Sequence, residues 1–341
     1  MEGFNRQGAE RTALCVTAVI AATIVGLGFG RLMIAPADVA AILVSPIMGT
    51  MDTFTPQALL TVLNIRLPRV IAALGVGSSL ALAGASYQGL FKNPMVSPDI
   101  LGSSAGASFG AALGILLSFD NHLIQLMAFA VGLAAVLISY TSAVHIGHGG
   151  NQTLMLVLCG LIVGTLFQAF VSMIKYTADP DSKLPEITYW LMGSIAKVTW
   201  DDLRRFALPF VAGVIPLILL RWRLNAMSMG DEEAESLGIN IKTMRLVYII
   251  ASTLLTAAVV SIAGIIGWVG LIIPHVARFL FGPDNRSVLP ASFAIGGAFM
   301  VLVDTACRSL MASEIPLGIL TSVIGAPFFF FILLKTQRGE A

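Results

Sequence analysis

The sequence predicts an all-α membrane protein, a single domain over residues 1–341 that crosses the bilayer about ten times. Hydrophobic residues make up 57% of the chain and charged residues only 11%, whereas a soluble domain carries about 25% charged residues. Long apolar runs recur along the chain, and a helix needs about 20 such residues to cross the hydrocarbon core. Many of the 33 glycines stand four residues apart, a spacing that lets helices pack closely in lipid.

Apolar runs and the charged breaks between them define the expected spans. The first run follows Arg6 and Arg11. We interpret it as an uncleaved helix rather than a signal peptide, because it is long for a signal sequence and many spans follow. Residues 36–46 and 185–195 are expected to form short helices at the membrane edge. The expected spans are 12–31, 69–90, 98–118, 122–143, 153–175, 203–220, 244–265, 268–281, 287–308 and 318–334.

The sequence also suggests an internal repeat. Gly84 precedes Pro94 by the same interval at which Gly264 precedes Pro274, and the residues around both pairs are similar. Two half-chains of similar plan are common among transporters. We therefore expect these two segments to be structurally equivalent.

Composition and motifs exclude several classes of protein. The net charge of +1 gives no basic excess for a nucleic acid partner. A P-loop is absent, since the dipeptide Gly-Lys does not occur, so we do not expect an enzyme that hydrolyses nucleotides. The spacing of the cysteines fits neither a disulfide framework nor a metal site, and we expect no metal ligands. The three cysteines are Cys15, Cys159 and Cys307.

The most polar internal segment is residues 225–242, between two expected spans. Four acidic residues follow Gly230 there, and Leu237 and Gly238 close the acidic stretch. Acidic residues suit the first turn of a helix, and glycine suits the position just after its end. The segment therefore predicts a short surface helix that docks a partner, and the alternative is a solvated loop.

Two arginines, Arg66 and Arg69, flank a proline directly before an expected span. They are interpreted as cations presented outward for an acidic partner, and the alternative is that they extend to the membrane interface. Asp304 is the best candidate for a proton relay inside a span. It stands four residues before Arg308, however, and we expect an ion pair along the helix instead.

Four stretches together resemble the FecCD-type permeases, the membrane subunits of bacterial ABC importers for iron–siderophore complexes, haem and cobalamin. They are RLPRVIAALGVGSSLALAGASYQGLFKNPMVSPDILGSSAGA, GDEEAESLG, GIIGWVGLIIPHVAR and EIPLGILTSVIGAPFFFFIL. With the spacing between them they cover residues 60–335. The resemblance implies a fold like that of the cobalamin permease, with about ten helices per subunit.

The resemblance also implies partners. A second copy of the chain would complete the pore, and two cytoplasmic ATPase subunits would bind ATP and magnesium, so that this chain itself carries no cofactor. A substrate-binding protein would dock outside. The chain would lie in a bacterial or archaeal cytoplasmic membrane with both termini in the cytoplasm. An iron–siderophore complex is the expected substrate, with haem, cobalamin and molybdate as alternatives.

Residue roles follow from the same resemblance. The ATPase-coupling residues would be Gly230, Asp231, Glu232, Ala234, Leu237 and Gly238. Residues that dock the binding protein would be Arg66, Arg69 and Arg308. The cytoplasmic gate would be Asn151, Gln152 and Thr153, and the candidates for lining the pore are Gln168, Ser172 and Met173. An external gate would involve residues 185–195 and the segment from Pro316.

One alternative function stays open at this point, a secondary transporter driven by an ion gradient. Such a transporter needs ionisable side chains inside the membrane. Few charged residues interrupt the expected spans of this chain.

Overall fold

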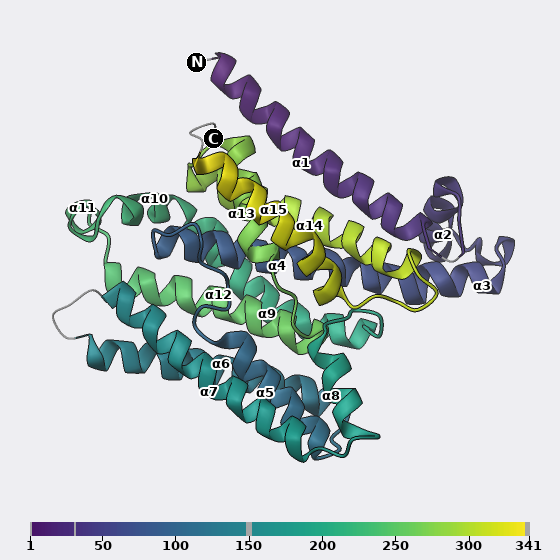
Figure 1. The fold of residues 1–341 in the computed structure, drawn as a ribbon. Coiled ribbons are helices and arrows are strands. Elements are labelled where there is room, and N and C mark those ends of the chain that lie inside the picture. Colours follow the sequence, from purple (N-terminus) through teal and green to yellow (C-terminus); the bar gives the residue numbers. More distant parts are fainter. Residues whose placement is uncertain (1, 31, 148–151, 338–341) are drawn as a thin grey trace.

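The computed structural model describes residues 2–30, 32–147 and 152–337, and this part of the chain is built of helices without strands (Figure 1). Six of its helices are long and apolar enough to cross a membrane, and a seventh span is bent by 56° between two helices. Four shorter apolar helices accompany them. The predicted fold class is confirmed, and about ten crossings remain an approximate number.

The long spans are α1 (Glu2–Gly28), α4 (Leu67–Leu90), α6 (Asn121–Ile146), α7 (Gln152–Thr177), α12 (Ile241–Ala263) and α14 (Asn285–Ser309). The bent span is α9 (Trp200–Leu219) with α10 (Arg221–Met229), and the shorter apolar helices are α2 (Pro36–Met48), α5 (Ser103–Leu116), α13 (Val269–Phe281) and α15 (Leu317–Gln337). The small helices are α3 (Pro56–Leu59), α8 (Lys183–Leu191) and α11 (Asp231–Ser236).

Several helices begin where a polar side chain caps their first backbone N–H groups. Asp120 accepts a hydrogen bond from the N–H of Leu123 at the start of α6, at 2.8 Å. The side chain of Asn240 does the same at the start of α12. Short side chains with an oxygen acceptor satisfy the free donors of the first turn, so these starts are readable from sequence.

The helix before α4 differs from the sequence prediction. We expected a span from residue 69, but the chain is already helical from Pro56, through a π-helical segment, Leu60–Arg66, that runs into α4. The N–H of Leu67 bonds to the carbonyl of Val62, five residues back. Pro68 has no N–H to donate, and a π-type turn accommodates that loss without ending the helix.

The centre of the bundle is α4, which packs against α13 and α14 through glycines. A Cβ atom added to Gly84 would lie 1.8 Å from the carbonyl oxygen of Gly270 in α13. One added to Gly77 would lie 2.0 Å from the carbonyl oxygen of Gly296 in α14. Lipid tails are as apolar as the side chains between helices, so close backbone contact has to hold such a bundle together.

Burial separates inner from outer helices. About two thirds or more of the apolar windows of α12 and α14 are buried, at 72% and 67%. For α1, α6 and α7 the buried share is between 28% and 33%. The outer helices therefore present long apolar faces to lipid or to another membrane helix.

The expected structural equivalence of the segments around Gly84 and Gly264 is wrong. Gly84 lies in the interior of α4, whereas Gly264 ends α12 with a φ of +67°. The two glycines match in the letters around them but not in conformation, because Gly84 permits close helix packing and Gly264 permits a left-handed turn.

The two ends of the bundle carry different elements (Figure 1). The start of α1, the end of α15 and the α10–α11 pair lie at one end, which we call the α11 end. The helices α2, α3 and α8 lie at the other, which we call the α8 end. Most of the candidate functional residues lie at one of these two ends.

The glycine contact of α4 gives a prediction. Gly84→Ala places a methyl group against a backbone carbonyl that cannot move without shifting α13, and we expect a loss of about 1–3 kcal/mol of stability. The measurement is thermal unfolding of the purified protein in detergent. Gly267→Ala is the matched control, because a Cβ atom there meets nothing within 4 Å. Equal melting temperatures for the two variants would contradict the packing argument.

Candidate functional site

The acidic segment forms the short surface helix α11. Its Ala234 is fully buried against the bundle, while Glu232 is exposed and Leu237 is 65% exposed. Gly230 precedes the helix in an extended conformation, with a φ of 167°, and Gly238 follows it with a φ of +78°. The predicted helix is present, and it presents acids and one leucine to the outside. Its role in docking a partner stays a prediction.

Asp231, the first residue of α11, holds that helix on the bundle. One carboxylate oxygen lies 3.1 Å from a guanidinium nitrogen of Arg245 in α12, and the other lies 3.6 Å from Nζ of Lys92. Arg245 also donates to the side-chain oxygen of Gln152, at 2.5 Å. The guanidinium group thus joins α11 to the first residue of α7.

The structure therefore brings part of the predicted gate next to the predicted coupling helix. Gln152 and Thr153 are the first two residues of α7. Asn151, the third gate residue, lies outside the described residues. Sequence proximity gave no sign of this link, since Gln152 and Asp231 are far apart in the chain.

A polar clamp fastens α10 beside α11. The amide of Asn225 donates to Asp284 at 2.6 Å and accepts from the N–H of Asn285 at 2.9 Å, which ties α10 to the start of α14. Burial acts to raise the pKa of Asp284, but the hydrogen bond from Asn225 and the nearby Arg286 outweigh it and hold that pKa below its usual value. Tyr248 of α12 donates to the carbonyl of Leu220, where α9 ends, at 2.7 Å.

The three arginines expected to face a partner are instead buried at the α8 end. Arg66 is 3% exposed and donates to the carbonyls of Leu27 and Gly28, at 2.7 and 2.9 Å. The last carbonyls of a helix lack partners within it, and a cation there also suits the helix dipole. The expectation that Arg66 is presented outward is therefore wrong for this structure, because its guanidinium group caps the end of α1.

Arg69 lies at the centre of a buried ionic cluster. Its Nε donates to both carboxylate oxygens of Asp304, at 2.9 and 3.0 Å, and one terminal nitrogen reaches Glu314 at 3.0 Å. Arg308 lies farther from Asp304, at 3.8 Å. The main partner of Asp304 is thus Arg69 rather than the Arg308 predicted from spacing, because a two-point contact across helices satisfies the carboxylate better.

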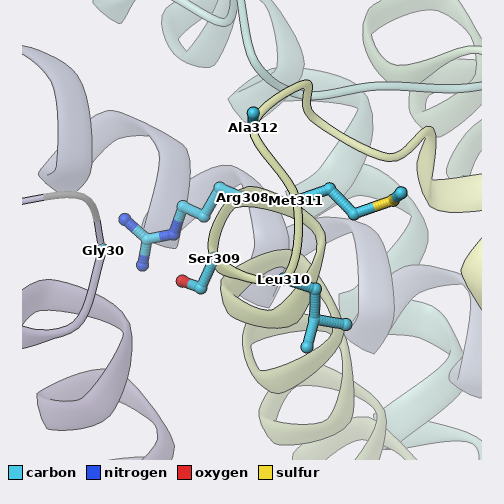
Figure 2. Close-up of a pocket in the computed structure, with 6 residues that line it drawn as sticks. All are labelled: Gly30, Arg308, Ser309, Leu310, Met311 and Ala312. Carbon is cyan, nitrogen blue, oxygen red and sulfur yellow. The ribbon is translucent and has the colours of Figure 1, made fainter.

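Arg308 lines a cavity at the surface of the α8 end (Figure 2). The cavity has a volume of about 550 Å³ and is lined by the end of α14 and the loop after it, with Gly30 on the opposite side. A terminal nitrogen of Arg308 bonds to the carbonyl of Gly26, while its buried Nε has no hydrogen-bond partner in the described residues. Arg308 thus lines this cavity, while its unsatisfied Nε is buried away from it.

The two segments predicted for the external gate are hydrogen-bonded to each other. The N–H of Leu317 donates to the carbonyl of Gly193 at 2.9 Å, and that of Gly318 donates to Met192 at 3.1 Å. The N–H of Ser194 donates to the carbonyl of Ala263 at the end of α12. The segment after α8 thus ties the start of α15 to the end of α12.

The pore candidates lie on α7. Gln168, Ser172 and Met173 are all exposed in the single chain, and the hydroxyl of Ser172 is bonded to the helix backbone. The exposed face of α7 carries large apolar residues besides these three. The assignment of these three residues to a pore stays a prediction.

Sequence reasoning missed three residues that hold these sites together: Arg245, Lys92 and Glu314. An arginine in the first turns of an apolar span is costly unless it has a partner, and that signal could have singled out Arg245. Among the described residues, no group of three or more His, Cys, Asp or Glu side chains is placed to hold a metal ion.

A bundle of about ten apolar helices with a polar surface helix at one end defines a multi-pass membrane protein. The model of the FecCD transport family matches residues 18–335. The chain therefore belongs to the FecCD transport family, as the sequence motifs predicted.

Relatives of known name cover most of the chain. A molybdate import system permease of Haemophilus influenzae is 39% identical over 96% of this chain and 94% of its own length. A probable iron chelatin permease of Helicobacter pylori is 39% identical over 81% of this chain and 83% of its own. A solved structure described as a metal-chelate type ABC transporter facing inward has a TM-score of 0.83, at 35% identity, over 96% of this chain and 99% of that one.

These likenesses settle the class of protein. The chain is a permease subunit of an ABC transporter, not an enzyme, and ATP hydrolysis belongs to a separate subunit. Family membership gives no support to the alternative of a secondary transporter.

The buried ionic cluster gives a second prediction. Asp304→Ala leaves the buried Arg69 without its main partner, and removing one member of such a pair costs about 3–5 kcal/mol. Asp201→Ala is the control, because the Asp201–Arg204 pair is exposed and such pairs contribute about 0.2–1 kcal/mol.

Thermal unfolding in detergent measures both variants. The double variant Arg69→Met with Asp304→Leu should regain part of the loss, because it removes the buried charge of Arg69, while Arg308 keeps its hydrogen bond to the carbonyl of Gly26. A double variant as unstable as Asp304→Ala would contradict the ionic explanation.

Proposed function

We propose that this permease imports an iron–siderophore complex across a bacterial or archaeal cytoplasmic membrane, as a pair of identical subunits. Two ATPase subunits on the α11 end would drive it, and a substrate-binding protein would deliver the complex to the α8 end. The start of α1 and the end of α15 would then face the cytoplasm, because both lie at the α11 end (Figure 1).

The observation that carries this proposal is α11. Its acids and Leu237 are exposed, while its Ala234 and Asp231 fix it to the bundle. An exposed leucine framed by carboxylates is a surface suited to a partner with an apolar cleft and a basic rim. That pattern supports Gly230, Asp231, Glu232, Ala234, Leu237 and Gly238 as the segment that contacts the ATPase.

A second copy of the chain is the partner that the apolar faces favour. The α7 face and α15 both carry exposed large hydrophobic residues, among them Leu161, Met173, Phe330 and Phe331. Burying such faces between copies would place Gln168 and Ser172 near the shared axis. The pore would then be lined by both subunits.

Docking of the binding protein is proposed at the cavity beside Arg308. A carboxylate of the partner that entered it would approach the side chain of Arg308, which lines the cavity. Arg66 and Arg69 would support the site indirectly, because each is already occupied by groups of this chain.

The iron–siderophore assignment rests on the neutral pore face. No Asp, Glu, Lys or Arg stands between Gln152 and Lys175, so α7 offers only apolar and neutral polar contacts. A chelate that wraps its metal in an organic shell can pass such a surface without leaving an unpaired charge.

Molybdate is the second candidate, because the H. influenzae relative named for it covers 96% of this chain. The direct test places the permease, its ATPase and its binding protein in proteoliposomes. Uptake of a ⁵⁵Fe-siderophore is compared with uptake of ⁹⁹Mo-molybdate, with and without ATP. ATP-dependent uptake of the iron complex alone supports the proposal. Molybdate uptake alone would replace the substrate, and uptake without ATP would overturn the importer.

The docking role of α11 gives a third prediction. Replacing both Glu232 and Leu237 by Lys removes the apolar contact and reverses a charge, and we expect substrate-stimulated ATPase activity of the complex to fall at least about tenfold. Membrane insertion should be unchanged because both side chains are exposed.

Lys242→Ala is the matched control, an exposed residue on the same end of the molecule but outside α11. Unchanged stimulation in the double lysine variant would refute the docking role.

A further inference from the structure

Arg245 stands out among the charged residues at the α11 end. It lies in the second turn of α12 and is only 5% exposed. Burying an arginine costs folding free energy unless its hydrogen-bond donors have partners. Here two of its nitrogens are engaged, one by a carboxylate and one by an amide oxygen, and these partners belong to different helices.

The first partner of Arg245 is Asp231 in α11. Among the acids of α11, Asp231 is the one that forms ion pairs with other described residues. It is half exposed and has Lys92 on its other oxygen, at 3.6 Å. Because Asp231 belongs to α11, any displacement of that helix moves its carboxylate relative to Arg245. The other acids of α11 are exposed.

The second partner of Arg245 is Gln152, the first residue of α7. A guanidinium group is planar and rigid, so two partners on separate nitrogens hold a fixed mutual geometry. Lysine has a single charged nitrogen on a flexible stem and cannot reproduce that geometry. Movement of α11 would thus shift the start of α7 through one side chain.

We propose that Arg245 is a positioning residue that transmits movement of α11 to the start of α7 and so sets the position of Gln152 and Thr153. The proposal deepens the proposed function and rests on it, because α11 moves only if an ATPase docks there. The link is a two-state contact: the Asp231–Arg245–Gln152 bridge holds in one state and is broken or displaced in the other.

The experiment uses the full complex of permease, ATPase and binding protein in nanodiscs. Thr153→Cys places a thiol next to Gln152, in a background where the three native cysteines are replaced by alanine. The rate of maleimide labelling is measured with and without ATP plus vanadate. In the parent complex we expect the two rates to differ.

Arg245→Lys should reduce that ratio of rates at least about fivefold, the lower end of a typical coupling between sites. Gln152→Ala, which leaves α11 untouched, should reduce it equally, and the double variant should show no further loss. Lys242→Ala, an exposed cation at the start of the same helix, should keep the parent ratio. Each variant should assemble with the ATPase subunits and the binding protein as the parent complex does.

The outcomes separate the two proposals. A parent complex that neither assembles nor hydrolyses ATP would overturn the proposed function. A working parent complex in which Arg245→Lys and Gln152→Ala keep the full response would overturn the role of Arg245 alone. A parent complex with no response to nucleotide, or a loss of assembly with Arg245→Lys, would also overturn that role, since the residue would then be structural.

Discussion

The close backbone contact of α4 with α13 and α14 is the constraint on which this bundle depends. Gly77 faces Gly296, and Gly84 faces Gly270, each closely enough to exclude a methyl group. In lipid the helices gain little from hiding apolar side chains, so van der Waals contact between backbones has to replace the hydrophobic effect. That contact fixes where α14 lies against α4, and with it the positions of Arg69 and Asp304 at one end of these helices.

Charged residues are few, and the structure uses many of them between helices. At the α8 end Arg66 caps α1, and Arg69 joins α4 to α14. At the α11 end Arg245 joins α11, α12 and α7. An arginine presents several donors in a rigid plane, which lets one side chain satisfy two or three elements in a medium that offers few other partners. The same side chains that hold the helices in place lie beside the surfaces where partners of an ABC permease would act.

Each surface proposed for a partner is thus held to the bundle by contacts within this chain. The exposed acids and leucine of α11 rest on Ala234 and Asp231, and the cavity beside Arg308 rests on the ionic cluster of Arg69. A docking element that is fixed to the bundle transmits force to it, whereas a free loop would absorb the movement. The proposed role of Arg245 depends on α11 being fixed to the bundle in this way.

The sequence by itself determined the fold class, most helix ends and the family, because hydrophobic length, capping residues and the motif from Arg66 are local signals. It also predicted α11, whose acids and glycines are contiguous. Only the tertiary structure decided the partners of the charged residues. Arg69 meets Asp304, and Arg245 meets Gln152, across 235 and 93 positions of the chain. Spacing along one helix suggested the pair of Asp304 with Arg308, but the helix packing set by glycine contacts brought a better partner to the carboxylate.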